Sequence, residues 1–426
     1  MTSPRELLLS SFNAALAAAD PLNLIAQHLP SPPKGKTLVV GAGKAAASMA
    51  LAVEQQWPSL NHRIEGLVVT RYQHGLLTNH IKVIEAGHPV PDEAGNAAAK
   101  EIFRLVKTLT PNDQLLVLLS GGGSSLMNLP AEGLAMKDIR DLTTQLLRSG
   151  APIQEMNVVR KHLSAIQGGR LAAACRAPIH TLIISDVVGD DPTHIASGPC
   201  VGDPSTYAEA IDILKRYNIQ TPASIQLFLE MGQSGSIPET PKPGDPALSR
   251  VKNIIIAKSQ TSLLAAQQFF TTNKIPSVIL GDTITGEARE VAKAQGALVR
   301  QIRQYAHPWA PPIALLSGGE CTVTVTGKGR GGRCSDFLLS LGLDLKGSEN
   351  TFALACDTDG IDGSESNAGA LLTPDALTRA RSLGLNPLAL LHQNDSYAFF
   401  HALGDLVLTG PTRTNVNDYR AILIGS

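Results

Sequence analysis

The sequence has few cysteines, few aromatic residues and almost no net charge. Its five cysteines are scattered, and none forms a Cys-x-x-Cys pair. This pattern argues against a disulfide framework and against a structural zinc site, and it fits a reducing cytoplasm. The formal net charge is −1, so bulk charge does not attract the protein to nucleic acid or to an anionic membrane.

Long apolar runs are also missing, since each run ends within a few residues at a charge or a glycine. Such runs are too short to span a bilayer. The N-terminus has no basic start leading into an apolar core, so we expect no signal peptide. We therefore expect a cytoplasmic protein whose partners are neither nucleic acid nor membrane, with self-association left open.

What is present is a pattern of short apolar strands that alternate with amphipathic helices. Helical spacing of apolar residues is clear at 92–109 and at 207–217. Strand–helix alternation predicts an α/β fold with parallel sheets covered by helices on both faces. The predicted buried strands are 37–40, 67–70, 114–119, 181–184, 253–257, 277–280, 313–316, 322–326, 352–356 and 420–424.

The length of 426 residues predicts two domains. The stretch 231–246 is rich in Pro, Gly and Ser and is the clearest candidate for a linker or a long surface loop. A second break falls at 307–312. We place a larger domain at 1–240, with part of 241–311 completing it, and a smaller α/β domain at 312–426.

The first glycine-rich turn follows the strand at 37–40 and contains Gly41, Gly43 and Lys44. Glycines let the backbone approach a phosphate, and a following helix offers unpaired N–H donors. Ala46 replaces the third glycine of a dinucleotide fingerprint, and Arg71 stands where an acidic residue is expected. A tight turn with a solvated lysine is the alternative reading.

Two further turns resemble each other. The first follows the strand at 114–119 and is a strong candidate for an anion cradle. It consists of Ser120, Gly121, Gly122, Gly123 and Ser124. The other, at 317–320, adds the carboxylate of Glu320, and it reads equally well as a structural turn.

A predicted helix carries Asn157, Arg160 and Lys161 at spacings that can place them on one side. Adjacent cations suit a carboxylate or a phosphate, although an ordinary solvated basic face is the alternative. Asp186 follows the strand at 181–184, at the sheet edge where α/β proteins bind ligands. It can accept the substrate proton, hold Mg²⁺, or simply close the strand in a turn.

Two loops near the C-terminus complete the candidates. The loop 327–333, which ends at Arg333, is rich in glycine and cations, so it can wrap a triphosphate or remain a solvated loop. Asp357 and Asp359 begin a cluster of carboxylates after the strand at 352–356, which suits Mg²⁺ or Mg²⁺–ATP. A polar capping loop is the alternative.

Together these motifs resemble the class II glycerate kinases that carry a C-terminal MOFRL module. The resemblance covers nearly the whole chain and rests on nine motifs in family order. They are 41–45, 87–91, 120–125, 157–162, 195–199, 317–320, 331–333, 358–363 and 414–417. At 334–336, Cys-Ser-Asp stands where the family tends to carry Asn-Gln-Glu.

The resemblance implies a Rossmann-like doubly wound sheet, a smaller MOFRL-type domain, and an active site in the cleft between the domains. It also implies phosphoryl transfer from ATP, with Mg²⁺, to the 2-hydroxyl of D-glycerate, giving 2-phosphoglycerate and ADP. Lys44, Asp186 and Arg333 become the catalytic candidates. Asp357 and Asp359 become the metal candidates. Substrate or nucleotide binding falls to Gly41, Gly43, 120–124, Asn157, Arg160, Lys161, Glu320 and Asn415.

Two other functions remain as rivals. The first is an NAD(P)H-dependent hydroxypyruvate reductase. This hypothesis is supported by the turn at Gly41 and Gly43 and by the labels that relatives in the family carry. The lysine in that turn and the several anion loops argue against it. The third class is a ligand-binding regulator that does not catalyse a reaction. The many charged residues in glycine turns argue against it, because binding alone requires fewer of them.

Overall fold

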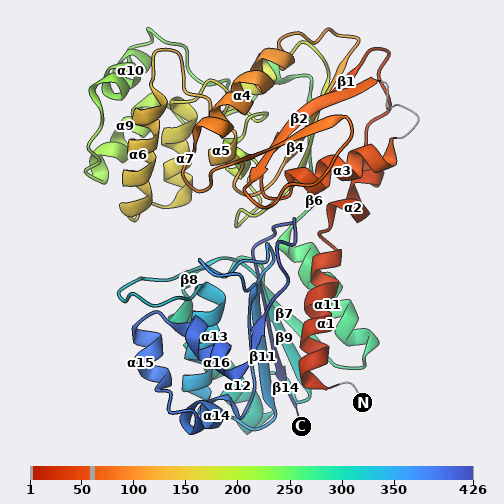
Figure 1. Cartoon of the computed structure of the whole chain (residues 1–426), viewed down its shortest axis with the longest axis vertical. Coiled ribbons are helices and arrows are strands. Elements are labelled where there is room, and N and C mark those ends of the chain that lie inside the picture. Colours follow the sequence, from red (N-terminus) through yellow and green to blue (C-terminus); the bar gives the residue numbers. More distant parts are fainter. Residues whose placement is uncertain (1–2, 58–62, 426) are drawn as a thin grey trace. The chain divides into compact units, whose positions relative to one another are not determined.

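The computed structural model describes residues 3–57 and 63–425. The chain divides into two compact units, each described here by itself. The first unit is Pro21–Ile256, and the second combines Met1–Asp20 with Ala257–Ser426. Both units are α/β, as the sequence pattern predicts (Figure 1).

The first unit is built on a six-stranded sheet with the order β3-β2-β1-β4-β5-β6. Neighbouring strands from β3 through β5 pair in parallel. The order reverses between β1 and β4, as in a doubly wound Rossmann sheet. The strands are β1 (Thr37–Ala42), β2 (Ile64–Arg71), β3 (Ile81–Ala86), β4 (Gln114–Leu119), β5 (Ile179–Ile184) and β6 (Val251–Ala257).

Helices cover both faces of this sheet because its buried strands alternate their apolar side chains between the faces. Val40, Val117 and Ile102 share one core cluster, which places α4 on that face. Val39 and Val68 are buried outside that cluster, and α3 contacts their strands. The helices here are α2 (Pro21–Leu24), η1 (Ile25–His28), α3 (Ala46–Gln56) and α4 (Glu93–Val106).

The long connections after β4 and β5 carry the remaining helices of the first unit. Asp92 caps α4, and Thr206 forms a capping box on α9, so both predicted helices begin at a polar side chain. The helices are α5 (Gly123–Leu126), α6 (Met136–Arg148), α7 (Ile153–His162), α8 (Arg170–Ala173), η3 (Ile195–Ser197), α9 (Tyr207–Arg216), α10 (Ala223–Gln233) and η4 (Pro246–Leu248).

The second unit has its own six-stranded sheet, in the order β13-β12-β11-β14-β9-β7, and a two-stranded sheet of β10 and β8. Only β7 and β9 pair in parallel in the larger sheet. The strands are β7 (Ser277–Gly281), β8 (Gly286–Glu287), β9 (Ile313–Ser317), β10 (Cys321–Thr322), β11 (Thr351–Asp357), β12 (Gly369–Leu372), β13 (Leu406–Val407) and β14 (Asp418–Ile424).

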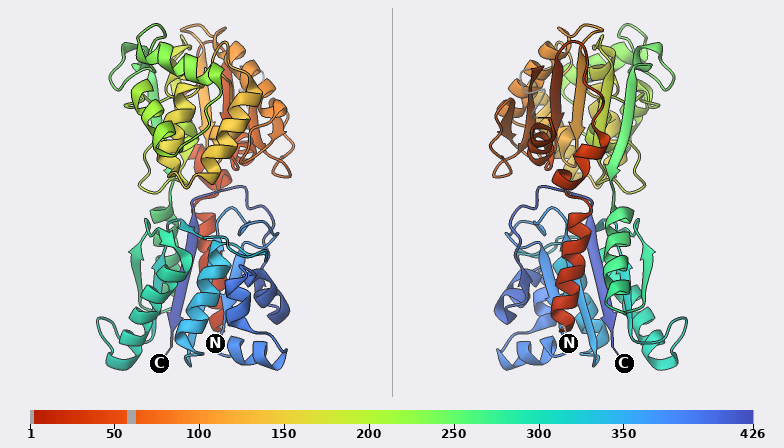
Figure 2. Two further views of the ribbon diagram at one scale, coloured as in Figure 1. Left: turned by 90° about the vertical axis from the view of Figure 1, so that its left-hand side faces the viewer. Right: turned by 90° about the vertical axis from the view of Figure 1, so that its right-hand side faces the viewer.

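Two helices that lie far apart in the sequence pack side by side on one face of that sheet. They are α1 (Pro4–Ala17) and α11 (Ser259–Thr272), and they share a core cluster with Leu316 and Leu354 (Figures 1 and 2). The other face carries α12 (Ala288–Tyr305), α13 (Arg333–Leu345), α14 (Ala376–Ser382), α15 (Pro387–His392) and α16 (Ser396–Leu403).

The predicted domain limits differ from the observed units. Strand β7 pairs with β9, and α1 packs on the same sheet, so 1–20 and 257–311 belong with the C-terminal part of the chain. Neither predicted linker lies at a boundary between the units. Residues 231–246 stay within the first unit, where the carbonyl of Pro241 accepts from the N–H of Asp203 and Glu239 accepts from Tyr207.

The expectation of parallel pairing is confirmed for β3 through β5 of the first sheet and wrong for most of the second sheet. A loop without a helix joins β11 to β12, so the chain returns antiparallel. The strand predicted at 322–326 is also wrong beyond Thr322, because Asn394 binds the backbone N–H groups of Thr326 and Gly327 instead of a neighbouring strand.

No single helix in the described ranges has the length and apolar character needed to cross a membrane. One bent pair, Pro4–Ala17 with Pro21–His28, meets the criterion by length and composition only.

Candidate active site

Two of the predicted glycine turns meet at the reversal point of the first sheet. They follow β1 and β4, which are neighbours in that sheet. The N–H of Lys44 donates to the carbonyl of Gly121 at 2.8 Å, and the N–H of Ala45 donates to the hydroxyl of Ser120 at 3.0 Å. In open α/β sheets, ligands bind at such a switch point beyond the carboxyl ends of the strands.

Glycine is required where the two turns touch. Gly43 has φ +140°, and a Cβ atom there would lie 2.1 Å from the Ser120 hydroxyl oxygen. Gly122 has φ +82°, and its Cβ would run into the ring of His88 at 2.8 Å. Both positions combine a backbone conformation that L-residues avoid with a neighbour that leaves no room.

The second turn offers donors for an anion. The backbone N–H groups of Gly121 and Gly122 find no acceptor within residues 3–57 and 63–425. Gly121 is buried and Gly122 is half-buried, and backbone N–H groups shielded from water are rarely left without a partner, so an oxygen of a ligand or of water is expected there. Lys44 begins the stretch that leads into α3, which brings a cation to the same pair of turns.

Arg160 adds a second cation on α7. Its Nη1 lies 3.4 Å from Oδ1 of Asn157, and no carboxylate pairs with it in the described part of the chain. Burial lowers the pKa of Arg160 to about 10, because nothing negative offsets the loss of water. A guanidinium with most of its donors unused is suited to a carboxylate or a phosphate.

Lys161, predicted to bind substrate with Arg160, points into the protein instead. Its Nζ forms an ion pair with Oδ1 of Asp203 at 2.6 Å, and both side chains are buried. Burial acts to raise the pKa of Asp203, but the Lys161 charge and the bonds from Lys161 and Ser205 hold it below its ordinary value. Helical geometry turns adjacent residues to different sides, so only Arg160 stays available.

Asp186 lies two residues beyond β5 and is partly exposed. Since β5 is the neighbour of β4, its carboxyl end belongs to the same sheet edge as the turn at 120–124. The structure thus places Asp186 on the edge predicted from the sequence. Its role as base or metal ligand stays a prediction.

In the second unit, Arg333 binds three carboxylates. Its guanidinium lies 2.7 Å from Asp418, 2.7 Å from Asp357 and 3.2 Å from Glu320. Burial acts to lower the pKa of Arg333, but these three partners raise it above its ordinary value. Asp418 also lies 3.3 Å from Arg420, so the cluster joins two guanidinium groups to three carboxylates. Glu320 is the most exposed of the partners.

Asp357 and Asp359 do not form a ready-made metal site. Asp357 accepts from Arg333 and from the N–H of Asp359, and Asp359 accepts from the N–H of Ile361 at 2.8 Å. Across the described ranges, no group of three or more His, Cys, Asp or Glu residues is arranged to hold a metal ion. The assignment of Asp357 and Asp359 as metal ligands stays a prediction, and Mg²⁺ is treated below as part of the nucleotide.

Asn415 is buried in the same unit, and its side-chain oxygen accepts from the N–H of Asn417 at 3.3 Å. The carbonyl of Asn417 in turn accepts from Thr358, which lies next to Asp357. The segment 414–417 thus braces the acidic loop that begins at Asp357. A direct role of Asn415 in binding stays a prediction.

The unusual Cys-Ser-Asp segment at 334–336 lies in the interior. Ser335 donates to Asp362, and Asp336 accepts from Ser396 at 2.6 Å and pairs with Arg289 at 2.9 Å. Burial raises the pKa of Asp362 to about 6, although the bonds from Ser335 and Cys334 oppose that rise. The segment that departs from the family pattern is thus held by its own buried contacts, and the adjacent Arg333 keeps its contacts with Asp357 and Asp418.

Sequence reasoning missed several residues that support these sites. Ser197 lies 2.8 Å from the Ser124 hydroxyl, His88 packs over Gly122, and Asp418 is the buried partner of Arg333. The first two fall within the motifs at 195–199 and 87–91. Their positions depend on loops that return to the sheet edge, and local sequence patterns do not reveal such returns.

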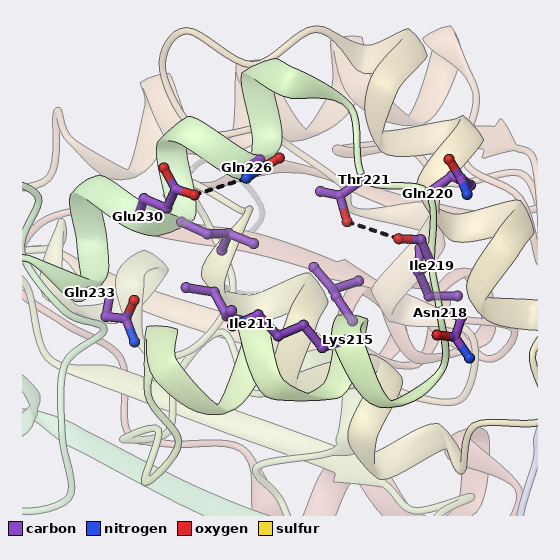
Figure 3. A pocket seen from close by; sticks show the side chains of 11 residues that line it. Ile211, Lys215, Asn218, Ile219, Gln220, Thr221, Gln226, Glu230 and Gln233 are labelled. Carbon is purple, nitrogen blue, oxygen red and sulfur yellow. Dashed lines mark hydrogen bonds between the residues drawn. The ribbon is translucent and has the colours of Figure 1, made fainter.

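A separate cavity of about 510 Å³ lies between α9 and α10 (Figure 3). Its lining includes Ile211, Lys215 and Gln226, and none of the predicted site residues. On the α10 side, the exposed Gln226 donates to Glu230, one turn further along the same helix, at 2.9 Å. The cavity holds neither a glycine turn nor a cluster of cations, so it does not suit phosphate chemistry.

Comparison with known proteins shows what this chain is similar to. A domain of unknown function, DUF4147, matches residues 7–230, and the MOFRL family matches residues 313–418. A putative hydroxypyruvate reductase from Agrobacterium vitis is 49% identical over 99% of this chain and 95% of its own length. The glycerate 2-kinase of Pyrococcus horikoshii is 38% identical over 99% of this chain and 98% of its own.

A solved structure is similar over the same extent. The crystal structure of a glycerate kinase from Thermotoga maritima matches with a TM-score of 0.87 at 36% identity, and the match covers 99% of each chain.

Proposed function

Because the chain belongs to the glycerate 2-kinase family that carries a MOFRL module, we propose that it transfers the γ-phosphoryl group of ATP to the 2-hydroxyl of D-glycerate. The products are 2-phosphoglycerate and ADP. The observation that carries this proposal is the pair of glycine turns at the switch point, with Lys44 and the unpaired Arg160 in the same unit.

Phosphoryl transfer depends on positioning and on charge neutralisation more than on covalent help from the protein. The N–H groups of Gly121 and Gly122, together with Lys44, form a cradle for phosphoryl or carboxylate oxygens. Arg160 suits the carboxylate of glycerate, because a guanidinium binds a carboxylate through two parallel hydrogen bonds. These contacts fix the 2-hydroxyl relative to the phosphoryl group.

In the reaction, the oxygen on C2 of glycerate forms a bond to the γ-phosphorus, and the bond from that phosphorus to the bridging oxygen of ADP breaks. The hydroxyl proton needs an acceptor. Asp186, at the carboxyl end of β5, is our candidate for that base. A carboxylate within hydrogen-bond reach of the hydroxyl is suited to this role.

We assign the nucleotide to the residues around Arg333, with Mg²⁺ arriving on its phosphates. Mg²⁺ keeps several waters and needs only one or two protein carboxylates when phosphates bind it. Glu320 is the exposed partner of Arg333, so it can leave the guanidinium without uncovering a buried charge. The Arg333 guanidinium would then bind a phosphate of the nucleotide, while Asp418 and Asp357 hold the guanidinium in its orientation.

Reduction of hydroxypyruvate by NAD(P)H is the second candidate, and the name of the Agrobacterium vitis relative favours it. The sheet order and the turn at Gly41 and Gly43 are compatible with a dinucleotide. However, Arg71 ends β2, where a carboxylate for the ribose hydroxyls is expected. Arginine at that strand end still permits NADPH, so the two reactions must be compared directly.

The test is one comparison with the full chain. D-glycerate is incubated with ATP and Mg²⁺, and hydroxypyruvate is incubated separately with NADH or NADPH. We expect ADP formation in the first assay and no nicotinamide oxidation in the second. Phosphorus–proton correlation NMR of the product identifies the phosphorylated carbon. Oxidation of the nicotinamide without ADP formation overturns the proposal, and phosphorylation at C3 overturns the assigned position.

A further inference from the structure

The segment that carries Ser197 has an unusual backbone. Ala196, Ser197 and Gly198 follow one another with φ of 50°, 57° and 57°. A left-handed conformation is unfavourable for an L-residue, because its Cβ atom crowds the following carbonyl oxygen. Two consecutive non-glycine residues in it, both buried, are a concentration of strain that the surrounding structure must hold in place.

The surrounding structure does hold this turn. The N–H groups of Gly168 and Gly169 donate to the carbonyls of Ser197 and Gly198 at 2.9 and 2.8 Å. Ala196 packs against Gly123, where a Cβ atom would lie only 2.6 Å from the alanine methyl. The strained turn is therefore clamped between the segment before α8 and the second glycine turn.

These contacts fix the position of the Ser197 hydroxyl. The Ser197 oxygen lies 2.8 Å from the Ser124 hydroxyl and 3.3 Å from Oδ1 of Asn157. Nδ2 of Asn157 donates to the carbonyl of His194 at 3.2 Å, so its Oδ1 must face the other way. That oxygen is also the one that lies 3.4 Å from Arg160.

Ser197 is thus the only described residue bonded both to the glycine turn and to Asn157, the partner of Arg160. We propose that Ser197 is a positioning residue, which holds Ser124 and Asn157 so that Arg160 and the glycine turn grip one acidic substrate together. The proposal rests on the function proposed above, because it takes D-glycerate as that substrate.

The chemistry of this chain of groups favours a hydroxy acid. The single hydroxyl proton of Ser197 is shared between the Ser124 oxygen at 2.8 Å and Oδ1 of Asn157 at 3.3 Å. The Ser124 hydroxyl therefore keeps its own proton for an oxygen of the substrate, while Arg160 supplies charge for a carboxylate. Oriented donors of this kind improve binding because little rearrangement is needed on contact. The strain at Ser197 is then the cost of this orientation.

The first test removes the hydroxyl. Ser197→Ala should fold and should weaken D-glycerate binding about tenfold, the effect of losing one oriented hydrogen bond. Titration calorimetry gives the dissociation constant of D-glycerate, and steady-state kinetics gives KM and kcat for both substrates. We expect the KM for D-glycerate to rise and the KM for ATP to stay near its original value.

The second test separates the hydroxyl from the strain. Ser197→Gly removes both, so it should raise the melting temperature and still bind D-glycerate poorly. Ala196→Gly relieves the neighbouring strain and keeps the hydroxyl, so it should raise the melting temperature while binding as the original does. Binding by Ser197→Gly as tight as in the original overturns the proposal, even if Ser197→Ala does not fold.

A double-mutant cycle with Ser124→Ala shows whether Ser197 acts through its neighbour. If it does, Ser124→Ala/Ser197→Ala should bind D-glycerate about as poorly as the worse single variant. Fully additive losses overturn the proposal. If the original chain binds D-glycerate but does not phosphorylate it, the proposed function is wrong. The binding constants of the variants would still test the positioning role of Ser197. If the original chain does not bind D-glycerate, both ideas fail.

Discussion

The N–H of Lys44 donates to the carbonyl of Gly121 at 2.8 Å, across two strands that are neighbours in the sheet but lie far apart in the chain. This bond makes one unit of two glycine turns that the sequence presents separately. A cation and two unpaired N–H groups come with it. The chemistry we propose depends on this joined arrangement more than on either turn alone.

Lys44→Ala should lower kcat by about 10²-fold or more, because it removes a fixed charge beside the transferring phosphoryl group. Lys44 is partly exposed, so the melting temperature should change little. Lys100→Ala is the matched control, since Lys100 is exposed on α4. Turnover of Lys44→Ala close to that of the control would remove Lys44 from the site.

Gly43→Ala should disrupt the junction of the two turns. The new methyl group would lie 2.1 Å from the Ser120 hydroxyl, at a φ of +140°. Gly133→Ala is the matched control, because Gly133 also has a positive φ, +89°, but nothing lies within 4 Å of its Cβ position.

We expect Gly133→Ala to cost about 1–2 kcal/mol in the free energy of unfolding, from backbone conformation alone. Gly43→Ala should cost clearly more and should also abolish activity. Chemical denaturation measures both. Equal losses in the two variants would mean that the turns can separate without harm.

Much of the first unit could be predicted from the sequence. Its buried strands are short apolar runs that end at Gly, Ser or Asp, and β1, β2, β4, β5 and β6 all lie where this pattern places them. Strand β3 was missed, because Lys82 and Glu85 interrupt its apolar pattern on an edge strand with one exposed side.

The division of the chain could not be predicted in the same way. Helix α1 begins the sequence, yet Phe12 stacks with Tyr419 at a centroid distance of 5.7 Å. No local pattern reports a partner some four hundred residues away. The predicted site residues show the same limit. Arg160 and Lys161 are adjacent cations, and the ion pair with the buried Asp203 is what turns Lys161 inward.

Lys161→Met should therefore lower the free energy of unfolding, with no direct effect on kcat. Removing one partner of a buried ion pair leaves the other charge uncompensated, at a cost of about 3–5 kcal/mol. Asp203→Asn combined with Lys161→Met should recover part of that loss. Thermal unfolding measures the effect, and the fraction that stays folded should keep a near-normal kcat. A large fall in kcat with an unchanged melting temperature would return Lys161 to the binding site.

Arg333 requires a test that separates structure from catalysis. Arg333→Gln should destabilise the second unit, because Asp418 and Asp357 lose the guanidinium that lies 2.7 Å from each. Arg333→Lys keeps the charge but not the planar fork that reaches both carboxylates. We expect the lysine variant to recover most of the stability and little of the turnover. Recovery of both by lysine would show that charge alone suffices and that the fork has no part in binding phosphate.

Asp186→Asn tests the proposed base. Asp186 is partly exposed at the end of β5, so the substitution should change the melting temperature little. If the carboxylate accepts the proton of the 2-hydroxyl, kcat should fall by about 10²–10⁴-fold. Asp212→Asn, at an exposed position on α9, is the control.

The same variant tells the base from a metal ligand. A ligand role predicts that a higher Mg²⁺ concentration restores part of the turnover of Asp186→Asn, because a weakened site fills again by mass action. A base role predicts no such recovery, since added metal does not replace the proton acceptor. An unchanged rate together with an unchanged Mg²⁺ titration would leave Asp186 only the task of closing the turn after β5.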